Sequence, residues 1–303
     1  MTGLCEGRVV IVTGAGRGLG RAHALAFAAE GAKVVVNDLG ATREGDGTSE
    51  GPAHDVAAEI RALGGEAVVD GADVADWDQA ESLVALAVDS FGRLDVLVNN
   101  AGFLRDRMLA NMDEAEWDAV IRVHLKGHFA PTRHAMAHWK ARAKAGEDVQ
   151  GRIINTSSGA GILGSVGQGN YSAAKGGIAT LTLVESAEFG RYGVTANAIA
   201  PAARTRMTEE VFAATMASPE AGAFDEMAPE NVSPLVVWLG SVESADVTGR
   251  MFEVEAGRIG VADGWQHGPT IDRGERWEPS QVGDAVATLL AAAPAPAPVY
   301  GAS

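Results

Sequence analysis

Three polar side chains in this sequence have types and a spacing that suit proton transfer. Tyr171 and Lys175 lie four residues apart in a segment with a helical pattern, so they share one face of that helix. Ser158 lies thirteen residues before Tyr171, directly after the apolar strand pattern at 152–156. A neighbouring ammonium group stabilises a phenolate and lowers the tyrosine pKa from its ordinary value of about 10. The three residues therefore indicate general acid–base chemistry at the end of a strand.

A glycine-rich turn near the start of the chain gives the second signal. The apolar segment 9–12 leads into Thr13–Gly20, and a helical pattern follows from Arg21 to Glu30. A strand, a glycine turn and a helix in this order begin a dinucleotide-binding fold. Glycines let the backbone approach a pyrophosphate, and the N–H groups at the helix start favour its negative charge. The expected cofactor contacts in this turn are Gly14, Gly16, Arg17, Gly18, Leu19 and Gly20.

Strand and helix patterns alternate along the rest of the chain. We expect further strands at 33–38, 66–70, 94–98, 152–156 and 194–200, and helices at 55–63, 77–91, 114–144 and 171–192. Strands that are apolar on both faces indicate a parallel sheet between two helical layers. The predicted fold is α/β, a Rossmann-type, three-layer, doubly wound parallel sheet in a single domain. Its ligand crevice should lie at the carboxyl ends of the strands.

The chain divides into residues 1–262, which we assign to this domain, and a C-terminal extension at 263–303. The extension is partly of low complexity, because alanine and proline alternate through 291–298, a composition typical of a flexible tail. A second interpretation is that the extension docks on the core or on a neighbouring subunit through Trp265, Trp277 and the apolar stretch 286–290.

These motifs together resemble the short-chain dehydrogenase/reductase family over about residues 6–260. The segment Asn99–Gly102 joins the glycine turn, Ser158 and the Tyr171/Lys175 pair in the order and spacing of that family. A narrower resemblance is to the (3R)-hydroxyacyl-CoA dehydrogenase unit of multifunctional enzyme type 2. It rests on the segments 36–40, 99–107, 122–125, 168–175 and 252–254. This resemblance implies NAD-dependent oxidation of a 3-hydroxyacyl thioester.

The resemblance also implies roles for single residues. Tyr171 would be the acid/base, Ser158 would bind the substrate oxygen, and Lys175 would act on Tyr171 and bind the nicotinamide ribose. The family usually has an asparagine in the triplet before Gly127, where this sequence has His124. Two interpretations of His124 stay open: it anchors a relay water next to Lys175, or it is a buried helix histidine bonded to the backbone.

Asp38 determines the expected cofactor. A carboxylate at the end of the second strand accepts hydrogen bonds from ribose hydroxyls and repels a 2′-phosphate, so NAD is favoured over NADP. Arg17 argues the other way, because a basic residue in the glycine turn can bind that phosphate. By resemblance, the further cofactor contacts are Asp73, Val74, Asn100, Ala101, Gly102, Tyr171, Lys175 and Pro201.

The substrate side is defined less sharply. Residues 204–227 are rich in methionine and phenylalanine, which suits an apolar, adaptable ligand as well as ordinary packing. Candidates for the opposite wall are Leu104, Met108, Ile162 and Leu163. Candidates for binding thioester phosphates, or for solvated salt bridges, are Arg105, Arg107, Arg204 and Arg206. The expected partner is a small-molecule substrate, an apolar thioester.

The composition of the chain argues against several other kinds of partner. The formal net charge of −16 over 303 residues repels nucleic acid and anionic membranes, and no apolar stretch approaches the roughly 18 residues of a membrane span. We therefore expect neither as a partner, and the Cys/His spacing predicts no metal site. The lone cysteine, Cys5, excludes an internal disulfide and indicates a reducing compartment, the cytoplasm. The family resemblance implies a homodimer or homotetramer.

Three functions stay open at this point. The first is an NAD-dependent hydroxyacyl-thioester dehydrogenase. The second is a 17β-hydroxysteroid dehydrogenase or an NADPH-dependent 3-ketoacyl reductase, and Asp38 speaks against NADPH. The third is a catalytically silent cofactor-binding sensor, against which the intact Ser158, Tyr171 and Lys175 speak.

Overall fold

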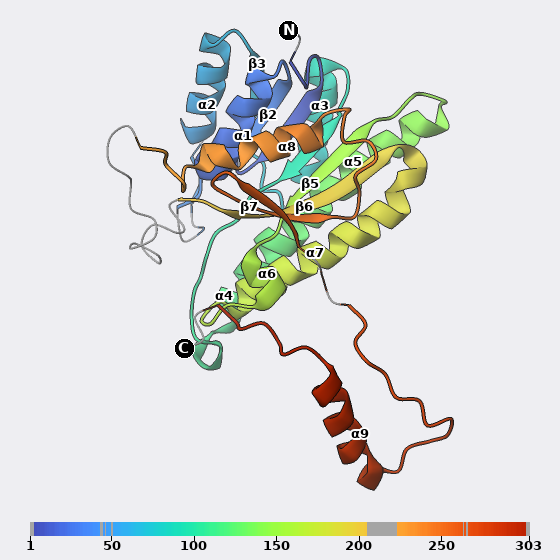
Figure 1. Ribbon diagram of the computed structural model, residues 1–303. Coiled ribbons are helices and arrows are strands. Elements are labelled where there is room, and N and C mark those ends of the chain that lie inside the picture. The colour runs from blue at the N-terminus through green and yellow to red at the C-terminus, as the bar shows by residue number, and fades with distance from the viewer. Residues whose placement is uncertain are drawn as a thin grey trace.

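One central β-sheet organises the chain in the computed structural model, which describes residues 3–42, 45, 47–49, 51–204, 223–262, 264 and 266–300 (Figure 1). Within these residues, eight strands form the sheet in the order β3-β2-β1-β4-β5-β6-β7-β8. Neighbouring strands pair in parallel, apart from β7 and β8, which are antiparallel. The strands are β1 (Val9–Thr13), β2 (Lys33–Asn37), β3 (Glu66–Asp70), β4 (Val96–Asn99), β5 (Gly151–Thr156), β6 (Val194–Ala202), β7 (Met251–Glu255) and β8 (Arg258–Ala262).

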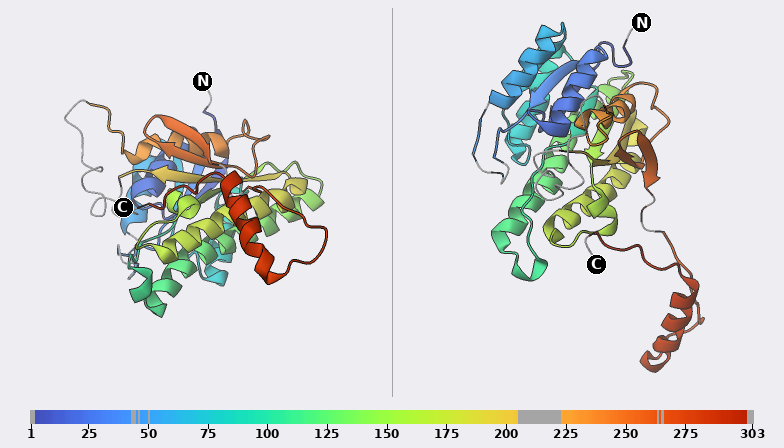
Figure 2. Two further views of the ribbon diagram at one scale, coloured as in Figure 1. Left: turned by 60° about the horizontal axis from the view of Figure 1, so that its bottom comes forward. Right: turned by 60° about the vertical axis from the view of Figure 1, so that its left-hand side comes forward.

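Helices cover both faces of this sheet (Figure 2). One face packs against α1 (Gly18–Ala29), α2 (Gly51–Ala62) and α8 (Ser233–Gly240). The other packs against α3 (Trp77–Phe91), α5 (Gly127–Lys144) and α7 (Gly169–Phe189). The remaining helices are α4 (Glu114–Ile121), α6 (Gly159–Leu163) and α9 (Pro279–Ala292), with 3-10 turns at Leu109–Asn111, Gly190–Tyr192 and Pro229–Asn231. None of the described helices is long and apolar enough to cross a bilayer.

The predicted doubly wound α/β fold is confirmed. The chain runs from β1 outward to β2 and β3, then returns to β4 on the other side of β1. An open sheet of this kind binds ligands in the crevice at the carboxyl ends of the strands where the order reverses. The crevice therefore lies above β1 and β4.

Several elements differ from the sequence prediction. The helix expected at 114–144 is divided, because a π-helical turn at Arg122–Lys126 separates α4 from α5. The first helix begins at Gly18, so the last residues of the glycine turn are already helical. The sequence pattern also did not predict β7, β8, α6, α8 or α9.

A chain of buried polar side chains fastens α7 to the middle of the sheet. Asn99 donates one hydrogen bond to Asn155 (2.9 Å) and one to Thr132 of α5 (2.9 Å). Asn155 in turn donates to Thr182 (2.9 Å) and to the Glu185 carboxyl group (2.7 Å), both on α7. Buried polar groups are costly unless they are hydrogen-bonded, so these contacts fix where α7 lies on β5.

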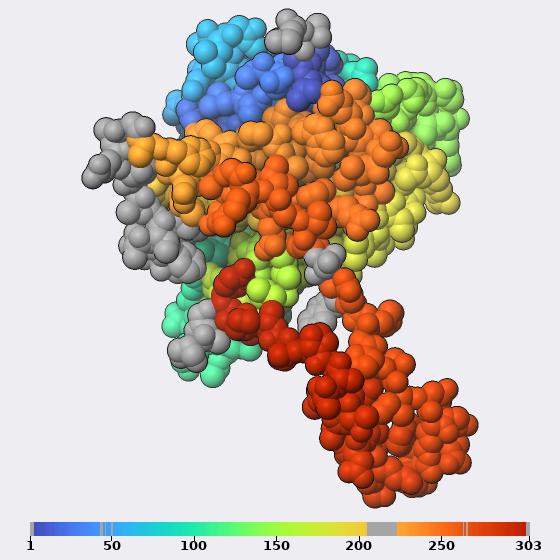
Figure 3. All heavy atoms as spheres, viewed as in Figure 1, coloured from blue at the N-terminus to red at the C-terminus, as the bar shows by residue number. Residues whose placement is uncertain are grey.

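The C-terminal extension leaves the body and returns to it. Helix α9 lies apart from the sheet and its layers, and none of its residues is buried (Figure 3). The stretch 286–290, expected as a docking surface, belongs to this helix and does not pack on the core. Trp265 lies outside the described residues. The chain then comes back to the body, where Tyr300 pairs with Ser165.

Glu185 should make stability fall as the pH rises. Burial raises the pKa of its carboxyl group from 4.5 to about 8, and the Asn155 hydrogen bond only partly opposes this. The folded protein therefore keeps a proton that the unfolded chain releases, so the free energy of unfolding decreases between about pH 4.5 and pH 8. We expect Glu185→Gln to raise the midpoint of thermal unfolding at pH 8 and to have a much smaller effect at pH 5. Each kcal/mol corresponds to roughly 2–4 °C in a chain of this size.

Glu188→Gln, at an exposed position one turn further along α7, is the matched control. Calorimetric unfolding of the three proteins across this pH range would contradict the account if wild type and Glu185→Gln showed the same pH dependence.

Candidate active site

The structure brings Ser158, Tyr171 and Lys175 together at the carboxyl end of β5. Ser158 is the N-cap of α6, and its hydroxyl accepts a hydrogen bond from the Ala160 N–H (3.2 Å). The same hydroxyl is hydrogen-bonded to Tyr171. The Lys175 ammonium lies 5.5 Å from the centre of the Tyr171 ring. A hydroxyl, a phenol and an amine therefore converge from two helices that follow the same strand.

Lys175 is almost completely buried, with 2% of its surface exposed. Its Nζ donates to the Thr156 carbonyl oxygen (2.6 Å) at the last residue of β5. The Ser157 hydroxyl donates to the backbone carbonyl of Lys175 (2.8 Å), which ties α7 to the same strand end. Burial lowers the pKa of Lys175 from 10.5 to about 7. Lys175 can therefore exchange a proton near neutral pH.

Burial has the opposite effect on Tyr171. It raises the pKa of the phenol, and the carboxylate of Asp106 adds to that rise, while the Ser158 hydrogen bond lowers it. The sequence led us to expect a lowered Tyr171 pKa, but the protein's own groups raise it. Desolvation of the phenolate outweighs the hydrogen bond from Ser158.

His124 lies in the π-helical turn, with its ring edge-on to Tyr171 at 5.3 Å between ring centres. Its Nε2 is 2.7 Å from the Phe103 carbonyl oxygen and 3.2 Å from the Phe103 N–H. Burial, followed by the charge of Lys175, lowers the His124 pKa to about 3, so the ring is neutral. Nδ1 has no hydrogen-bond partner within the described part of the chain. The bond to the backbone is thus present, and the other ring nitrogen, Nδ1, is buried without a partner among the described residues.

His128 is a buried histidine that the sequence reasoning missed. It lies one helical turn after His124 and is 1% exposed. Burial is the main reason that its pKa lies well below the ordinary value, and the charges of Lys175 and His124 lower it further. The signal was available: two histidines four residues apart on a predicted helix share a face.

A pocket of about 300 Å³ opens above β1 and β4, at the predicted crevice. Its lining includes most of the expected cofactor residues, namely Gly14, Arg17, Gly18, Leu19, Gly20, Asp38, Asp73, Val74, Asn100, Ala101 and Gly102. It also includes residues that were not expected, among them Thr42, Phe103 and Arg122. Some of the expected cofactor residues that the structure describes do not line this pocket, namely Gly16, Tyr171, Lys175 and Pro201.

Asp38 holds the glycine turn against the end of β2. Its carboxylate accepts hydrogen bonds from the Gly16 N–H (2.7 Å) and the Gly40 N–H (2.6 Å). Asp73, after the neighbouring strand β3, is paired with Arg122 (2.6 Å), and both residues line the pocket. The pocket therefore carries a carboxylate held by the backbone, and the charge of Arg122 is neutralised by Asp73. These features fit the ribose of a dinucleotide.

Glycine is required at two positions around this pocket. A methyl group on Gly20 would lie 2.1 Å from the Gly14 carbonyl oxygen, so α1 could not pack so closely on β1. A methyl group on Gly102 would lie 2.2 Å from Cε1 of His124. The two glycines thus allow close packing around the pocket, of Gly20 on the Gly14 backbone and of Gly102 on the His124 ring.

Most of the basic residues expected on the substrate side already contact other side chains of the protein. Arg107 is paired with Glu116 (2.6 Å), and Arg204 is paired with Asp225. Arg105 lies over the Phe103 ring at 5.6 Å. Arg206 and most of the methionine-rich segment, residues 205–222, lie outside the described residues. No cluster of His, Cys, Asp or Glu suited to a metal ion occurs in the part of the chain that was described.

The fold and the site define a dinucleotide-dependent oxidoreductase, and comparison with known proteins gives the family. A sequence profile for short chain dehydrogenases matches residues 8–215, and the chain belongs to that family. The family acts on small molecules with a nicotinamide cofactor, NAD(H) or NADP(H).

Individual relatives cover most of the chain. It is 46% identical over 288 residues to "Hydroxyacyl-CoA dehydrogenase ChsB1" of Mycobacterium tuberculosis, covering 91% of this chain and 86% of the relative. It is 48% identical to the mouse "Peroxisomal multifunctional enzyme type 2", covering 84% of this chain but 32% of that longer protein. A crystal structure of a short chain dehydrogenase from Mycobacterium avium is 66% identical, has a TM-score of 0.90, and is covered over its full length.

The close contact of Gly102 with His124 can be tested by substitution. We expect Gly102→Ala to lower the free energy of unfolding by about 1–3 kcal/mol, because the added methyl group must displace a fully buried ring. Gly71→Ala is the control, since nothing lies within 4 Å of a methyl group there. Urea denaturation of both variants checks the prediction. Equal stability of Gly102→Ala and wild type would show that the His124 ring is not fixed at this place.

Proposed function

We propose that this protein is an NAD-dependent dehydrogenase that oxidises a secondary alcohol to a ketone, with a 3-hydroxyacyl-CoA thioester as substrate. The observation that carries the proposal is the convergence of Ser158, Tyr171 and Lys175 beside a crevice that has Asp38 at its far end. The names of the relatives from Mycobacterium tuberculosis and mouse support the thioester. The proposed acyl chain is a fatty chain or a steroid side chain.

In the proposed reaction, Ser158 donates a hydrogen bond to the substrate oxygen and holds the carbinol carbon in place. Tyr171 accepts the hydroxyl proton in this proposal, since its phenol interacts with the Ser158 hydroxyl that holds the substrate oxygen. A nicotinamide ring held in the adjoining crevice would take up the hydride, and its positive charge would favour the phenolate. Positioning of both reactants supplies much of the rate.

Lys175 carries the proton onward in this mechanism. Its pKa of about 7 lets it gain or lose a proton near neutral pH, and its ammonium form stabilises the phenolate. His124 and His128, both neutral and buried beside Lys175, face the same interior. Because burial raises the Tyr171 pKa, oxidation should become faster as the pH increases.

NAD rather than NADP is the proposed cofactor. The Asp38 carboxylate is held by two backbone N–H groups in the pocket wall, where a ribose hydroxyl can bind and a 2′-phosphate would be repelled. Arg17 also lines this pocket, but one cation next to a fixed carboxylate does not make a phosphate site.

We further propose that the protein is a homodimer or homotetramer in a reducing compartment, the cytoplasm. Apolar side chains of α3, α5 and α7 remain exposed on one side of the body, namely Trp77, Phe129, Leu183 and Val184. Exposed apolar surface of this kind is typical of a protein interface.

Turnover by wild type and Tyr171→Phe tests the proposed reaction. With NAD, wild type should reduce the cofactor in the presence of 3-hydroxyacyl-CoA thioesters, followed by absorbance at the NADH band. Tyr171→Phe should lower kcat/KM by about 10²–10⁴-fold, because it removes the group that accepts the proton. Tyr192→Phe, on a 3-10 turn away from the site, is the control.

An unchanged rate in Tyr171→Phe would exclude this acid/base assignment. Turnover of 17β-hydroxysteroids but not of thioesters would favour the steroid alternative. Binding of NADH without turnover of any alcohol in the panel would favour a silent sensor.

Asp38→Asn tests cofactor choice, because it removes the charge and keeps one acceptor oxygen, so that one of the two backbone N–H groups still has its partner. We expect the ratio of kcat/KM for NAD over NADP to fall by about tenfold or more. Asp89→Asn, the same charge change at an exposed position of α3, should leave the ratio unchanged. A wild-type preference for NADP, or an unchanged ratio in Asp38→Asn, would refute the assignment of NAD to this carboxylate.

A further inference from the structure

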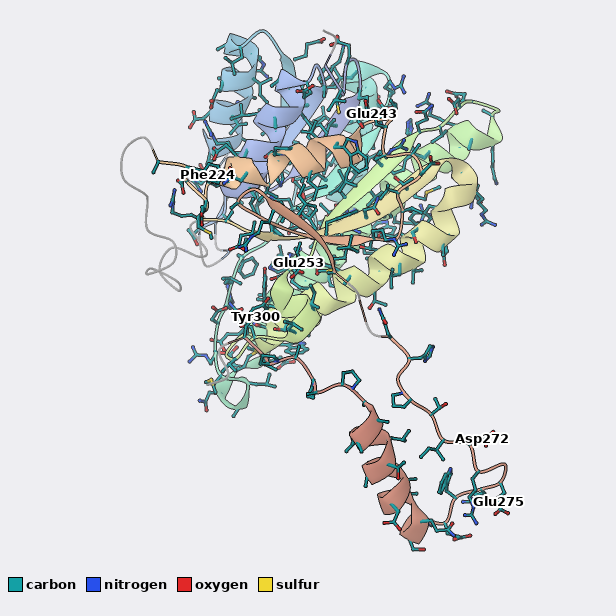
Figure 4. All side chains as sticks on the ribbon, viewed as in Figure 1. Phe224, Glu243, Glu253, Asp272, Glu275 and Tyr300 are labelled. Carbon is teal, nitrogen blue, oxygen red and sulfur yellow. The ribbon has the colours of Figure 1, made fainter. Side chains whose placement is uncertain are left out.

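The last residues that the structure describes lie against the segment that follows Ser158. The Tyr300 N–H donates to the Gly164 carbonyl (3.2 Å), and the Val166 N–H donates to the Tyr300 carbonyl (2.9 Å). These bonds form a parallel bridge between Tyr300 and Ser165. Figure 4 shows the Tyr300 side chain beside α6, although about 135 residues of chain separate the two segments. The C-terminal extension therefore ends at the catalytic side of the body.

Gly159 makes room for the Tyr300 side chain, and Gly164 lies in ordinary contact range of Val299. A methyl group on Gly159 would lie 2.8 Å from the Tyr300 hydroxyl oxygen and 3.0 Å from a ring carbon. A methyl group on Gly164 would lie 3.5 Å from a methyl of Val299. Gly159 is the residue after Ser158, so the Tyr300 ring packs one residue away from a proposed catalytic side chain.

Helix α6 fixes the position of Tyr300 relative to the rest of the site. On its other side, a methyl group on Gly161 would lie 2.6 Å from the Lys175 carbonyl carbon, so α6 packs directly on the backbone of α7. The short helix is thus held between the Lys175 segment and the C-terminal residues. Tyr300 is placed by the same element that places Ser158.

The exposed part of Tyr300 is available to a ligand. The residue is 47% exposed and Val299 is 41% exposed, and Ile162 and Leu163 of α6 are partly exposed nearby. The cofactor pocket lies above β1 and β4, whereas α6 continues from β5. A substrate bound at Ser158 with its carbinol carbon toward the cofactor can therefore extend one of its two arms toward α6. A tyrosine offers an apolar face with a polar tip, which suits an acyl chain.

We propose that Tyr300 is a specificity-determining residue that forms a wall for the acyl part of long or bulky substrates. This inference rests on the proposed function, because it assigns the acyl end of the same thioester substrate. In this proposal a ten-carbon acyl group contacts the wall over more of its length than a four-carbon group does.

The test compares a short and a long substrate in full-length Tyr300→Ala. With NAD, kcat/KM for 3-hydroxydecanoyl-CoA should fall about tenfold, while kcat/KM for 3-hydroxybutanoyl-CoA and the KM for NAD stay within about twofold. Tyr300→Phe should keep the wild-type ratio, because the apolar ring remains. Leu290→Ala, an exposed position of α9 in the same extension, is the matched control. Equal losses for both substrates, or no loss for either, would overturn the proposal.

A binding measurement separates this proposal from the proposed function. In the presence of NADH, calorimetric titration should give a Kd for 3-ketodecanoyl-CoA that rises about tenfold in Tyr300→Ala, with the Kd for acetoacetyl-CoA unchanged. Selective binding without turnover by wild type would contradict the dehydrogenase and leave the Tyr300 wall supported. The absence of any selective change in Kd would overturn the wall, whatever the turnover.

Discussion

The site depends on the burial of one amine against one carbonyl group. Lys175 is enclosed between α7, the end of β5, His124 of the π-helical turn and His128 of α5, and its Nζ bonds the Thr156 carbonyl at 2.6 Å. Removing an ammonium from water is costly, which is why its pKa falls to about 7. The amine is buried at the position where the proposed chemistry requires a group able to exchange a proton near neutral pH. The same burial raises the pKa of Tyr171, so the pKa values of the two groups move apart.

The surrounding scaffold keeps this pair in place through polar bonds and close backbone packing. Asn99 and Asn155 link two central strands to α5 and α7, and Glu185 completes that network in its protonated form. Gly161 lets α6 pack on α7 beside Lys175. Ser158 caps α6 and Tyr171 lies on α7, and these contacts hold both helices in place at the end of β5.

The sequence allowed the fold to be predicted because a parallel sheet leaves a strong pattern. Strands buried on both faces are uninterrupted apolar runs, as at Val9–Thr13, and each is followed by a helical period. The site at the strand ends followed from Ser158, Tyr171 and Lys175, whose spacing places them together in any such fold. The glycine turn and Asp38 located the cofactor crevice in the same way.

Other features depend on tertiary contacts that a local pattern does not contain. The division of helix 114–144 arises at the π-helical turn that carries His124, and no proline or glycine in that turn marks it. The direction of the Tyr171 pKa shift could not be foreseen, because it depends on how completely the phenol is desolvated. The contact of Tyr300 with Gly159 joins segments about 140 residues apart, and neither interpretation of the extension, a flexible tail or docking through residues 265–290, included Tyr300.

The protonation of Lys175 can be measured directly by NMR titration of protein labelled with ¹³C and ¹⁵N in its lysines. The chain has five lysines, so the resonances can be assigned by single substitutions. The account predicts one lysine signal with a midpoint near pH 7 that is lost in Lys175→Met. If no lysine signal titrates below about pH 9, or if the signal near pH 7 persists in Lys175→Met, the buried amine does not control proton transfer at this site.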